Sequence, residues 1–583
     1  MNRRDFLAST AAVAVLCATD TADGQTNPRE FVVTRYAQGV AVKPEMFGGN
    51  VLAPSQVLDP GEGDNGIDVG HLQDLAGITG ILRWPGGSLT EGNREICDTC
   101  TSGPKGNWLP YTGVDFGDFP WTQEIRDKFV NANGDYQPLA PTTPRPAPGS
   151  FRGIWANAVP ATATTPARPA RLEFRFLKTT LEDFLGYLHA HTHVKGAIVL
   201  PTHRFLWPRP TSRTDRVKYG ALNGMVQNMV NHVYGRIANG GMSNAKIFAW
   251  EIGNEYQGGE APSGEHVMTA AEYGRIAETA VRVVRITRPT AKVSIQGGSL
   301  WADVGQANSN FRNQVTELRT AFNLRANYYN TLAPDYLSLH TYSTTEYGHS
   351  AHGARLAHVR EVWGPIPIFV SEWNLQQAEE SSSYSLSTDT YRLGMERSWR
   401  LTSLFQALID NGAEAACFWP VVQGAESGLS SFDNVPVRHI SGELFKWLTE
   451  VKGMRTATVT GGWLAGDTGN LVKVRAYCGF DTDEVAIRNK AIIFVHARNT
   501  SAQTIRIKVM NMPNRTPQVS MQRISGASGP MTLPASFHVP YAVESNIGIT
   551  STGITGGRLL TLAIRNNPGH QPYEVLKITA NFA

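Results

Sequence analysis

Eight short apolar runs rich in β-branched residues alternate with longer stretches of helical periodicity between about residues 47 and 422. Amphipathic stretches such as 214–238, 270–287 and 391–411 lie between the runs. Strands that alternate with helices build parallel sheets, and eight such units are typical of a closed barrel. We therefore predict an α/β fold, a (β/α)8 TIM barrel, with an open doubly wound sheet as the alternative. The predicted strands cover residues 46–51, 80–84, 196–200, 247–252, 293–297, 336–340, 368–371 and 415–419.

The C-terminal part of the chain has a different pattern. Short alternating strands with turn signals, including 471–477, 491–497, 504–509 and 559–564, predict an antiparallel β-sandwich. A chain of 583 residues also exceeds what one hydrophobic core usually organises. We expect the barrel to occupy residues 46–446 and the sandwich residues 447–583, with a strand within residues 26–45 joining the sandwich.

A long insertion, about residues 93–169, separates the second and third predicted strands and is rich in Pro, Gly, Thr and Trp. Loops of this length are usually functional or disordered. Because it follows the C-terminal end of a strand, a barrel would place it on the active-site face, where it could wall a cleft. A surface loop without a role is the alternative.

The N-terminus reads as an export signal. Paired arginines at positions 3 and 4 precede Phe-Leu and an Ala/Val/Leu run too short to span a bilayer. We predict a twin-arginine signal peptide over residues 1–25, and a periplasmic or extracellular protein without membrane insertion. A frayed amphipathic terminus is the alternative, and recovery of the processed chain from the periplasm or medium would decide between them.

Charge and cysteine content limit the partners. The formal charge of +3 provides no broad basic field for nucleic acid. Cys97 and Cys100 form a single C-x-x-C without a second ligand pair, so a loop disulfide is favoured over a zinc site. Cys417 lies in an apolar run typical of an inert core thiol. We expect no cofactor and no metal, and the sequence does not determine the oligomeric state.

Two glutamates close two of the predicted strands. Glu255 follows the apolar run 247–252, and Glu372 follows the run at 368–371. Barrel enzymes keep their chemistry at this rim, so both carboxylates would face one pocket. Glycosidic bond cleavage needs such a pair, with carboxyl groups about 5 Å apart for retention and roughly 6.5 to 9.5 Å for inversion. Either glutamate alone could instead be a salt-bridged residue at a strand end.

Four motifs resemble strand motifs of clan A glycoside hydrolases. They are Leu-Arg-Trp-Pro-Gly-Gly at 82–87, Trp-Glu-Ile-Gly-Asn-Glu at 250–255, Leu-Ser-Leu-His-Thr-Tyr at 337–342 and Ser-Glu-Trp-Asn at 371–374. Within the clan they are most similar to the family 51 α-L-arabinofuranosidases. The resemblance implies a carbohydrate substrate and covers only the barrel, about residues 46–422, as short motifs in the right order.

The resemblance also implies roles for single residues. Glu255 corresponds to the acid/base, Glu372 to the nucleophile, and Asn254 to the residue that binds the sugar 2-hydroxyl. Arg83 corresponds to an arginine beneath the nucleophile, which would keep Glu372 ionised while a more apolar setting raises the pKa of Glu255. The residues expected to line or orient the sugar site are His340, Tyr342, Trp419 and, as a weaker candidate, Trp373.

The chain departs from family 51 at its first strand. That family usually has a sugar-binding glutamate shortly after the first-strand glycine, whereas residues 48–54 contain no acid. Asn50 could substitute. This departure favours a polysaccharide cleft at least as much as exo action on arabinofuranosides. A non-catalytic carbohydrate-binding protein and a polysaccharide lyase, whose base would be His340 or Tyr342, are the remaining alternatives.

Overall fold

The computed structural model describes part of the chain. The described residues are 29–50, 80–84, 152–156, 171–175, 181–207, 214–256, 268–297, 307–326, 333–343, 346–375, 391–419, 421, 428–429, 438–461, 471–498, 502–513, 515–526, 528–531, 541–565 and 573–582. The predicted signal peptide, the pair Cys97 and Cys100, and most of the 93–169 insertion lie outside it. No helix in the described ranges has the length and apolar character needed to cross a membrane.

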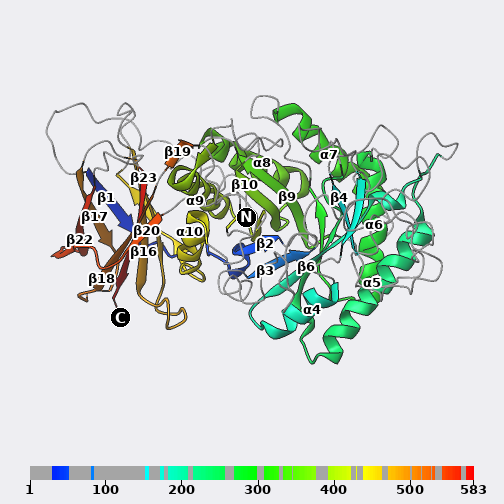
Figure 1. The fold of residues 1–583 in the computed structure, drawn as a ribbon, viewed down its shortest axis with the longest axis horizontal. Coiled ribbons are helices and arrows are strands. Elements are labelled where there is room, and N and C mark those ends of the chain that lie inside the picture. The colour runs from blue at the N-terminus through cyan, green and yellow to red at the C-terminus, as the bar shows by residue number, and fades with distance from the viewer. Residues whose placement is uncertain are drawn as a thin grey trace, which may run out of the picture.

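Eight parallel strands close into a barrel (Figure 1), which confirms the predicted fold and excludes the open sheet. Each predicted run contains one strand. In chain order the strands are β2 (Gly48–Asn50), β3 (Ile81–Trp84), β6 (Lys195–Leu200), β7 (Ile247–Ile252), β8 (Val293–Gln296), β9 (Tyr336–Ser343), β10 (Ile368–Leu375) and β12 (Ala415–Phe418). Parallel pairing of β12 with β2 completes the ring.

Helices surround the barrel (Figure 1). They are α4 (Leu181–Ala190), α5 (Tyr219–Asn239), α6 (Ala270–Thr287), α7 (Ala307–Ala326), α8 (Glu346–Trp363), α9 (Gly394–Asp410) and α10 (Ile440–Thr449). The start of α6 shows how the sequence sets a boundary. Thr269 and Glu272 form a reciprocal capping box, which satisfies donors at the helix start, and Arg216 binds both oxygens of Glu272 at 2.7 and 2.8 Å.

Side-chain alternation along the strands separates the barrel interior from the layer under the helices. A small cluster inside the barrel joins Ile81, Ala197, Ala249, Phe369, Ala415 and Cys417, whereas Trp84, Trp250 and Trp373 belong to the larger cluster that includes the helices. The ring is tight at β2, where a Cβ on Gly48 would lie 2.6 Å from the Ala416 carbonyl oxygen. Only glycine fits there. Cys417 is buried and free, as the apolar run predicts.

Two antiparallel-rich sheets form a sandwich beside the barrel (Figure 1). One sheet has the order β14-β1-β17-β22-β21 and the other β13-β15-β16-β23-β18-β20. Strand β1 comes from the N-terminal segment and runs parallel to β17. The strands are β1 (Arg29–Thr34), β13 (Arg455–Thr456), β14 (Thr458–Thr460), β15 (Leu471–Cys478), β16 (Lys490–Arg498), β17 (Gln503–Met510), β18 (Gln518–Gly526), β20 (Tyr541–Glu544), β21 (Ile549–Ile554), β22 (Gly557–Ile564) and β23 (Tyr573–Asn581).

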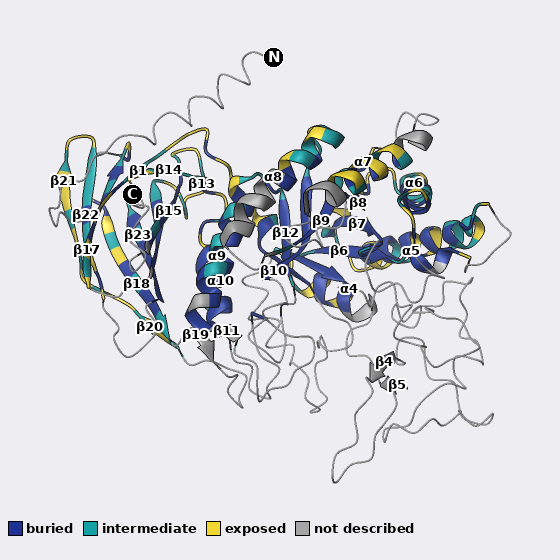
Figure 2. Ribbon diagram, turned by 90° about the horizontal axis from the view of Figure 1, so that it is seen from above, coloured by how far each residue is buried: buried dark blue, intermediate teal, exposed yellow. Residues whose placement is uncertain are grey.

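Strand β16 of the six-stranded sheet is buried on both faces. On β16, Ile493 and Val495 pack in the sandwich core, whereas Ile492 and Phe494 join the cluster that contains α9 and α10. Figure 2 shows this contact, with buried strands and helices meeting between the two units. The sandwich is therefore packed against the barrel helices through one continuous apolar layer, and β16 reads as an uninterrupted apolar run for that reason.

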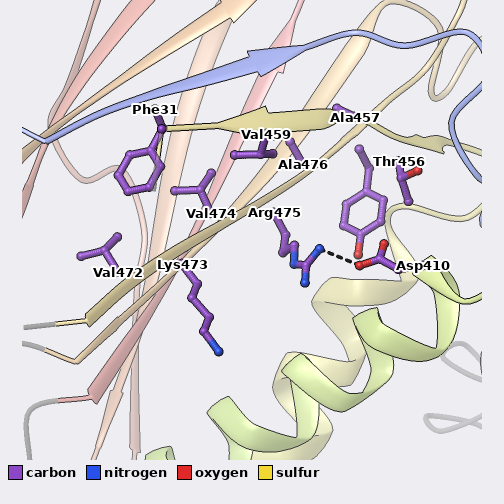
Figure 3. Close-up of a pocket in the computed structure, with 12 residues that line it drawn as sticks. Phe31, Asp410, Thr456, Ala457, Val459, Val472, Lys473, Val474, Arg475 and Ala476 are labelled. Carbon is purple, nitrogen blue, oxygen red and sulfur yellow. Dashed lines mark hydrogen bonds and ion pairs between the residues drawn. The ribbon is translucent and has the colours of Figure 1, made fainter. Parts of the chain in front are cut away.

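Two further strand pairs and a pocket lie in the described part of the chain. Strand β4 (Arg152–Ala156), within the insertion, pairs with β5 (Arg171–Arg175), just after it, a pairing that the sequence pattern did not predict. Strand β11 (Tyr391–Leu393), before α9, pairs with β19 (Ser528–Met531) of the sandwich region. A pocket of about 350 Å³ lies between β14, β15 and the end of α9 (Figure 3), and none of its lining residues belongs to the glutamate pair.

Candidate active site

The two rim glutamates meet at one histidine. Glu255 follows β7 and Glu372 lies in β10, and His340 of β9 places its Nδ1 atom 2.7 Å from Glu255 Oε1 and 3.3 Å from Glu372 Oε2. One oxygen of each carboxylate and one imidazole nitrogen all lie within 4.8 Å of one another. Residues far apart in sequence thus converge, as parallel strands ending at one barrel rim require. Histidine and carboxylate atoms at this spacing could also ligate a metal ion.

A local bend aims the nucleophile candidate. The pairing of β10 with β9 shifts register between Val370 and Glu372, which is the mark of a β-bulge. Tyr342, at the end of β9, donates a hydrogen bond of 2.7 Å to Glu372 Oε2. Burial raises the pKa of Tyr342 well above its ordinary value, with a further contribution from Glu372, so its hydroxyl stays a donor.

Arg83 lies beneath the site and is fully buried. Its guanidinium donates to Glu372 Oε1 at 2.6 Å, to Asn50 Oδ1 at 2.9 Å and to Asn254 Oδ1 at 2.8 Å. The fourth partner is Glu251 Oε2 at 2.5 Å. The planar Arg83 guanidinium thus holds Glu372 and Asn254, the neighbour of Glu255, in a fixed geometry. It also binds Asn50 of β2 and Glu251 of β7.

Glu251 is the site residue that the sequence analysis missed. It is fully buried in β7 and forms an ion pair with Arg83. A buried charge needs a partner, and Glu251 lies two residues along the strand from the inward-facing Ala249. A charged residue inside an otherwise apolar strand run was the signal that could have found it.

Burial dominates the electrostatics of Glu372. Burial raises the pKa of this carboxyl, and the nearby His340 and Arg83 only partly oppose the rise. The expected arginine contact is present, and the charge of Arg83 lowers the pKa of Glu372 in the expected sense, against the larger effect of burial. Loss of hydration raises the pKa of the Glu372 carboxyl more than the charge of Arg83 lowers it. Arg83 also forms an ion pair with Glu251, so its charge is shared between two carboxylates.

The pKa of His340 is also raised, but by the neighbouring carboxylates and not by burial. Burial lowers its pKa, but Glu372 and Glu255 raise it more, and the net shift is upward. Its Nδ1 contacts both carboxylates, and its Nε2 has no hydrogen-bond partner among the described residues. His340 is therefore suited to orient the two glutamates.

Asn50 and Trp373 are both fully buried beside the glutamate pair. The fully buried Asn50 uses its amide nitrogen on the Ser371 carbonyl at 2.9 Å and its oxygen on Arg83, so it braces strands and is not available to a sugar. Trp373 is fully buried and packs edge-on against Phe418 and near Phe405. Strand alternation explains this, since Glu372 faces the pocket and its neighbour must face the helices.

Trp419 lies at the end of β12 and is half-buried. Its carbonyl accepts a hydrogen bond of 2.5 Å from Asn374 Nδ2, and Arg397 of α9 donates to Asn374 Oδ1 at 2.8 Å. These bonds join the ends of β10 and β12 at the rim. The placement agrees with a tryptophan that borders the site, while Asn374 has a structural part.

Comparison with solved structures covers nearly the whole chain. The fold matches a family 51 α-L-arabinofuranosidase from Bifidobacterium longum with a TM-score of 0.57, 13% identity and coverage of 95% of this chain and 100% of that one. A family 51 arabinofuranosidase from Xanthomonas axonopodis pv. citri gives a TM-score of 0.58, 10% identity, and 95% and 100% coverage. A bifunctional glucanase-xylanase from a metagenome library gives 0.51, 11%, and 96% and 100%.

The chain shares the fold of these glycosidases. The resemblance drawn from four motifs is confirmed at the level of fold, since the shared architecture includes the β-rich C-terminal unit. No family model matches the sequence, and no curated protein matches it. At these identities the likeness establishes architecture, so activity must be argued from the geometry of the site.

Proposed function

We propose that the protein is a glycoside hydrolase that cleaves poly- or oligosaccharides with retention at the anomeric carbon, and that it is exported. The observation that carries the proposal is the convergence of Glu255 and Glu372, with carboxylate oxygens within 4.8 Å. A separation near 5 Å leaves no room for a water between carboxylate and sugar, which is the condition for a covalent intermediate.

The hydrogen bonds and exposure of the two glutamates support one assignment of their roles. Glu372 accepts from Arg83 at Oε1 and from Tyr342 at Oε2, which fixes the carboxylate that attacks the anomeric carbon. Glu255 is more exposed, with 12% of its side chain accessible against 3% for Glu372. It protonates the departing oxygen, and in the second step it deprotonates the water that releases the sugar.

Two other functions have less support. A lyase would need an accessible base, but the Tyr342 hydroxyl is bound to Glu372, and His340 is buried with its Nδ1 atom on Glu255. A non-catalytic binding protein would not need a buried and a half-buried carboxylate on one histidine, because burying charge is costly. Sugar identity, linkage and endo or exo action remain to be measured, with arabinofuranosides and β-glycans as the first substrates to test.

Product stereochemistry tests the proposal. Purified protein is incubated with a panel of aryl glycosides and plant, algal and microbial polysaccharides, and the anomer released is followed by proton NMR before mutarotation. We expect a reducing-end sugar of the same anomeric configuration as the substrate. An inverted product, an unsaturated sugar that absorbs in the ultraviolet, or no product on any substrate would overturn the proposal.

The role of Glu255 is tested by Glu255→Ala. Loss of the acid should lower kcat/KM about 10²- to 10⁴-fold for substrates with poor leaving groups and far less for those with activated ones. Azide, which needs no general base, should partly restore kcat and give a glycosyl azide. Absence of both effects in a folded variant would remove Glu255 from the acid/base role.

A further inference from the structure

Glu255 has an unusual backbone conformation. Its φ of +43° lies in the left-handed region, which side chains other than glycine rarely adopt. The other described non-glycine residues with positive φ are Asn489, Asn511 and Asn546, and asparagine tolerates this region. Glu255 is therefore the exception, and the surrounding structure must hold it there.

The restraints act on the residues beside Glu255. The backbone N–H of Tyr256 donates to the side-chain oxygen Oε1 of Gln296 at 3.0 Å, and the Tyr256 carbonyl lies 3.3 Å from His203 Nε2. On the other side, the N–H of Gly253 donates to the Leu200 carbonyl at 2.7 Å. The turn is thus tied to β6, β8 and the short helix η4 (His203–Phe205).

Tyr273 of α6 connects these restraints. Its hydroxyl donates to the Ile252 carbonyl at 2.6 Å and accepts from the backbone N–H of Gln296 at 2.8 Å. Its ring stacks on the ring of Tyr256, with centroids 4.3 Å apart and an interplanar angle of 18°. Both rings are buried. The same side chain therefore holds the residue before the turn, the residue after it and the strand that supplies Gln296.

We propose that Gln296 is a positioning residue for the acid/base: by accepting the Tyr256 N–H, it holds Glu255 in the left-handed conformation that brings its carboxyl to His340 and opposite Glu372. The inference rests on the proposed function. Without the acceptor, Glu255 relaxes toward the ordinary negative φ region. Its carboxyl group then moves away from the leaving-group oxygen. An error of about 1 Å in such a group costs on the order of 10²-fold in rate.

The test uses three variants of the full-length protein. Gln296→Met removes the acceptor at similar volume, and Gln296→Glu keeps an Oε1 acceptor and serves as the matched control. Tyr273→Phe removes the hydroxyl while the ring stack remains, and it replaces Gln296→Met if that variant does not fold. Thermal unfolding establishes that each variant is folded.

The readout is dependence on the leaving group, which a merely structural defect would not produce. We expect Gln296→Met to lower kcat/KM at least about 10-fold for a poor leaving group and less than about 3-fold for dinitrophenolate, with azide raising its kcat. Gln296→Glu should recover most of the loss. Equal losses on both substrates, or wild-type rates, would overturn the inference. If Glu255→Ala also lacks the leaving-group effect, the proposed function fails instead.

Discussion

Glu372→Gln should abolish turnover while leaving the protein folded. Glutamine cannot form the covalent glycosyl intermediate, and loss of a covalent nucleophile costs roughly 10⁴-fold or more in kcat. The fold should survive because the amide oxygen can still accept from Arg83, the amide nitrogen can donate to the Tyr342 hydroxyl oxygen, and Arg83 keeps its ion pair with Glu251. Hydrolysis of an activated aryl glycoside and near-ultraviolet circular dichroism check the two halves of this prediction.

The control is Glu361→Gln, which changes the same residue type on the exposed side of α8, where 80% of the side chain is accessible. It should have wild-type kcat and KM. Glu372→Gln retaining more than a few per cent of wild-type turnover would contradict the nucleophile assignment, provided that mass spectrometry shows no deamidation back to glutamate. The nucleophile must be ionised, and burial raises the pKa of Glu372. Activity should therefore fall on acidification at a higher pH than it would with an exposed carboxyl.

Acid should destabilise the protein through His496. This histidine lies on the face of β16 toward α9, is buried, and has no hydrogen-bond partner for either ring nitrogen among the described residues. Burial, with help from the charges of Lys473 and Arg475, lowers its pKa to about 3. Lys473 is fixed nearby over the ring of Trp399, and Arg475 by its ion pair with Asp410 (Figure 3).

The direction follows from proton linkage. The unfolded chain binds a proton at position 496 below about pH 6.5, and the folded chain does not until about pH 3, so stability present above pH 6.5 is lost as pH falls. Protonation of His496 in the unfolded chain should lower the free energy of unfolding by about 2 kcal/mol between pH 7 and pH 5. Lowering the pH thus favours entry of water between the sandwich and α9.

Denaturant unfolding at pH 7 and pH 5 measures the effect by difference. His496→Gln cannot titrate, so its loss of stability between the two pH values should be smaller than that of the wild type by about 2 kcal/mol. His189→Gln, at an exposed position near the end of α4, is the control and should behave as the wild type does. Parallel curves for the wild type and His496→Gln would refute the prediction.

The strand pattern was readable from the sequence because it depends on local chemistry. Apolar runs of four to eight residues separated by amphipathic stretches favour parallel strands joined by helices. All eight strands form where the runs predict them. Polar groups that close buried strands, Glu255 and Glu372 above all, were found for the same reason. A side chain at the C-terminal end of a parallel strand has its position fixed by topology.

The contacts of those side chains depended on tertiary structure. Asn50 and Trp373 were both expected to line the sugar site, yet the Asn50 amide nitrogen donates to carbonyls of β10 and β12, and the Trp373 ring faces the helices. Glu251 lies in one of the four motifs without an expected role and Gln296 lies in none of them, and each gains its part from a partner more than 39 residues away. The net pKa of Glu372 likewise depends on burial, which no local pattern specifies.

The amino-acid sequence by itself determined the barrel, the sandwich and the two acidic residues at the rim, because periodicity and strand ends are properties of neighbouring residues. Only the tertiary structure decided which groups hold those acids, how close they come and how burial changes their ionisation. These are distances between residues that meet only when the ring of strands closes, and hydrogen bonds and desolvation act over a few ångströms of space, whatever the separation along the chain.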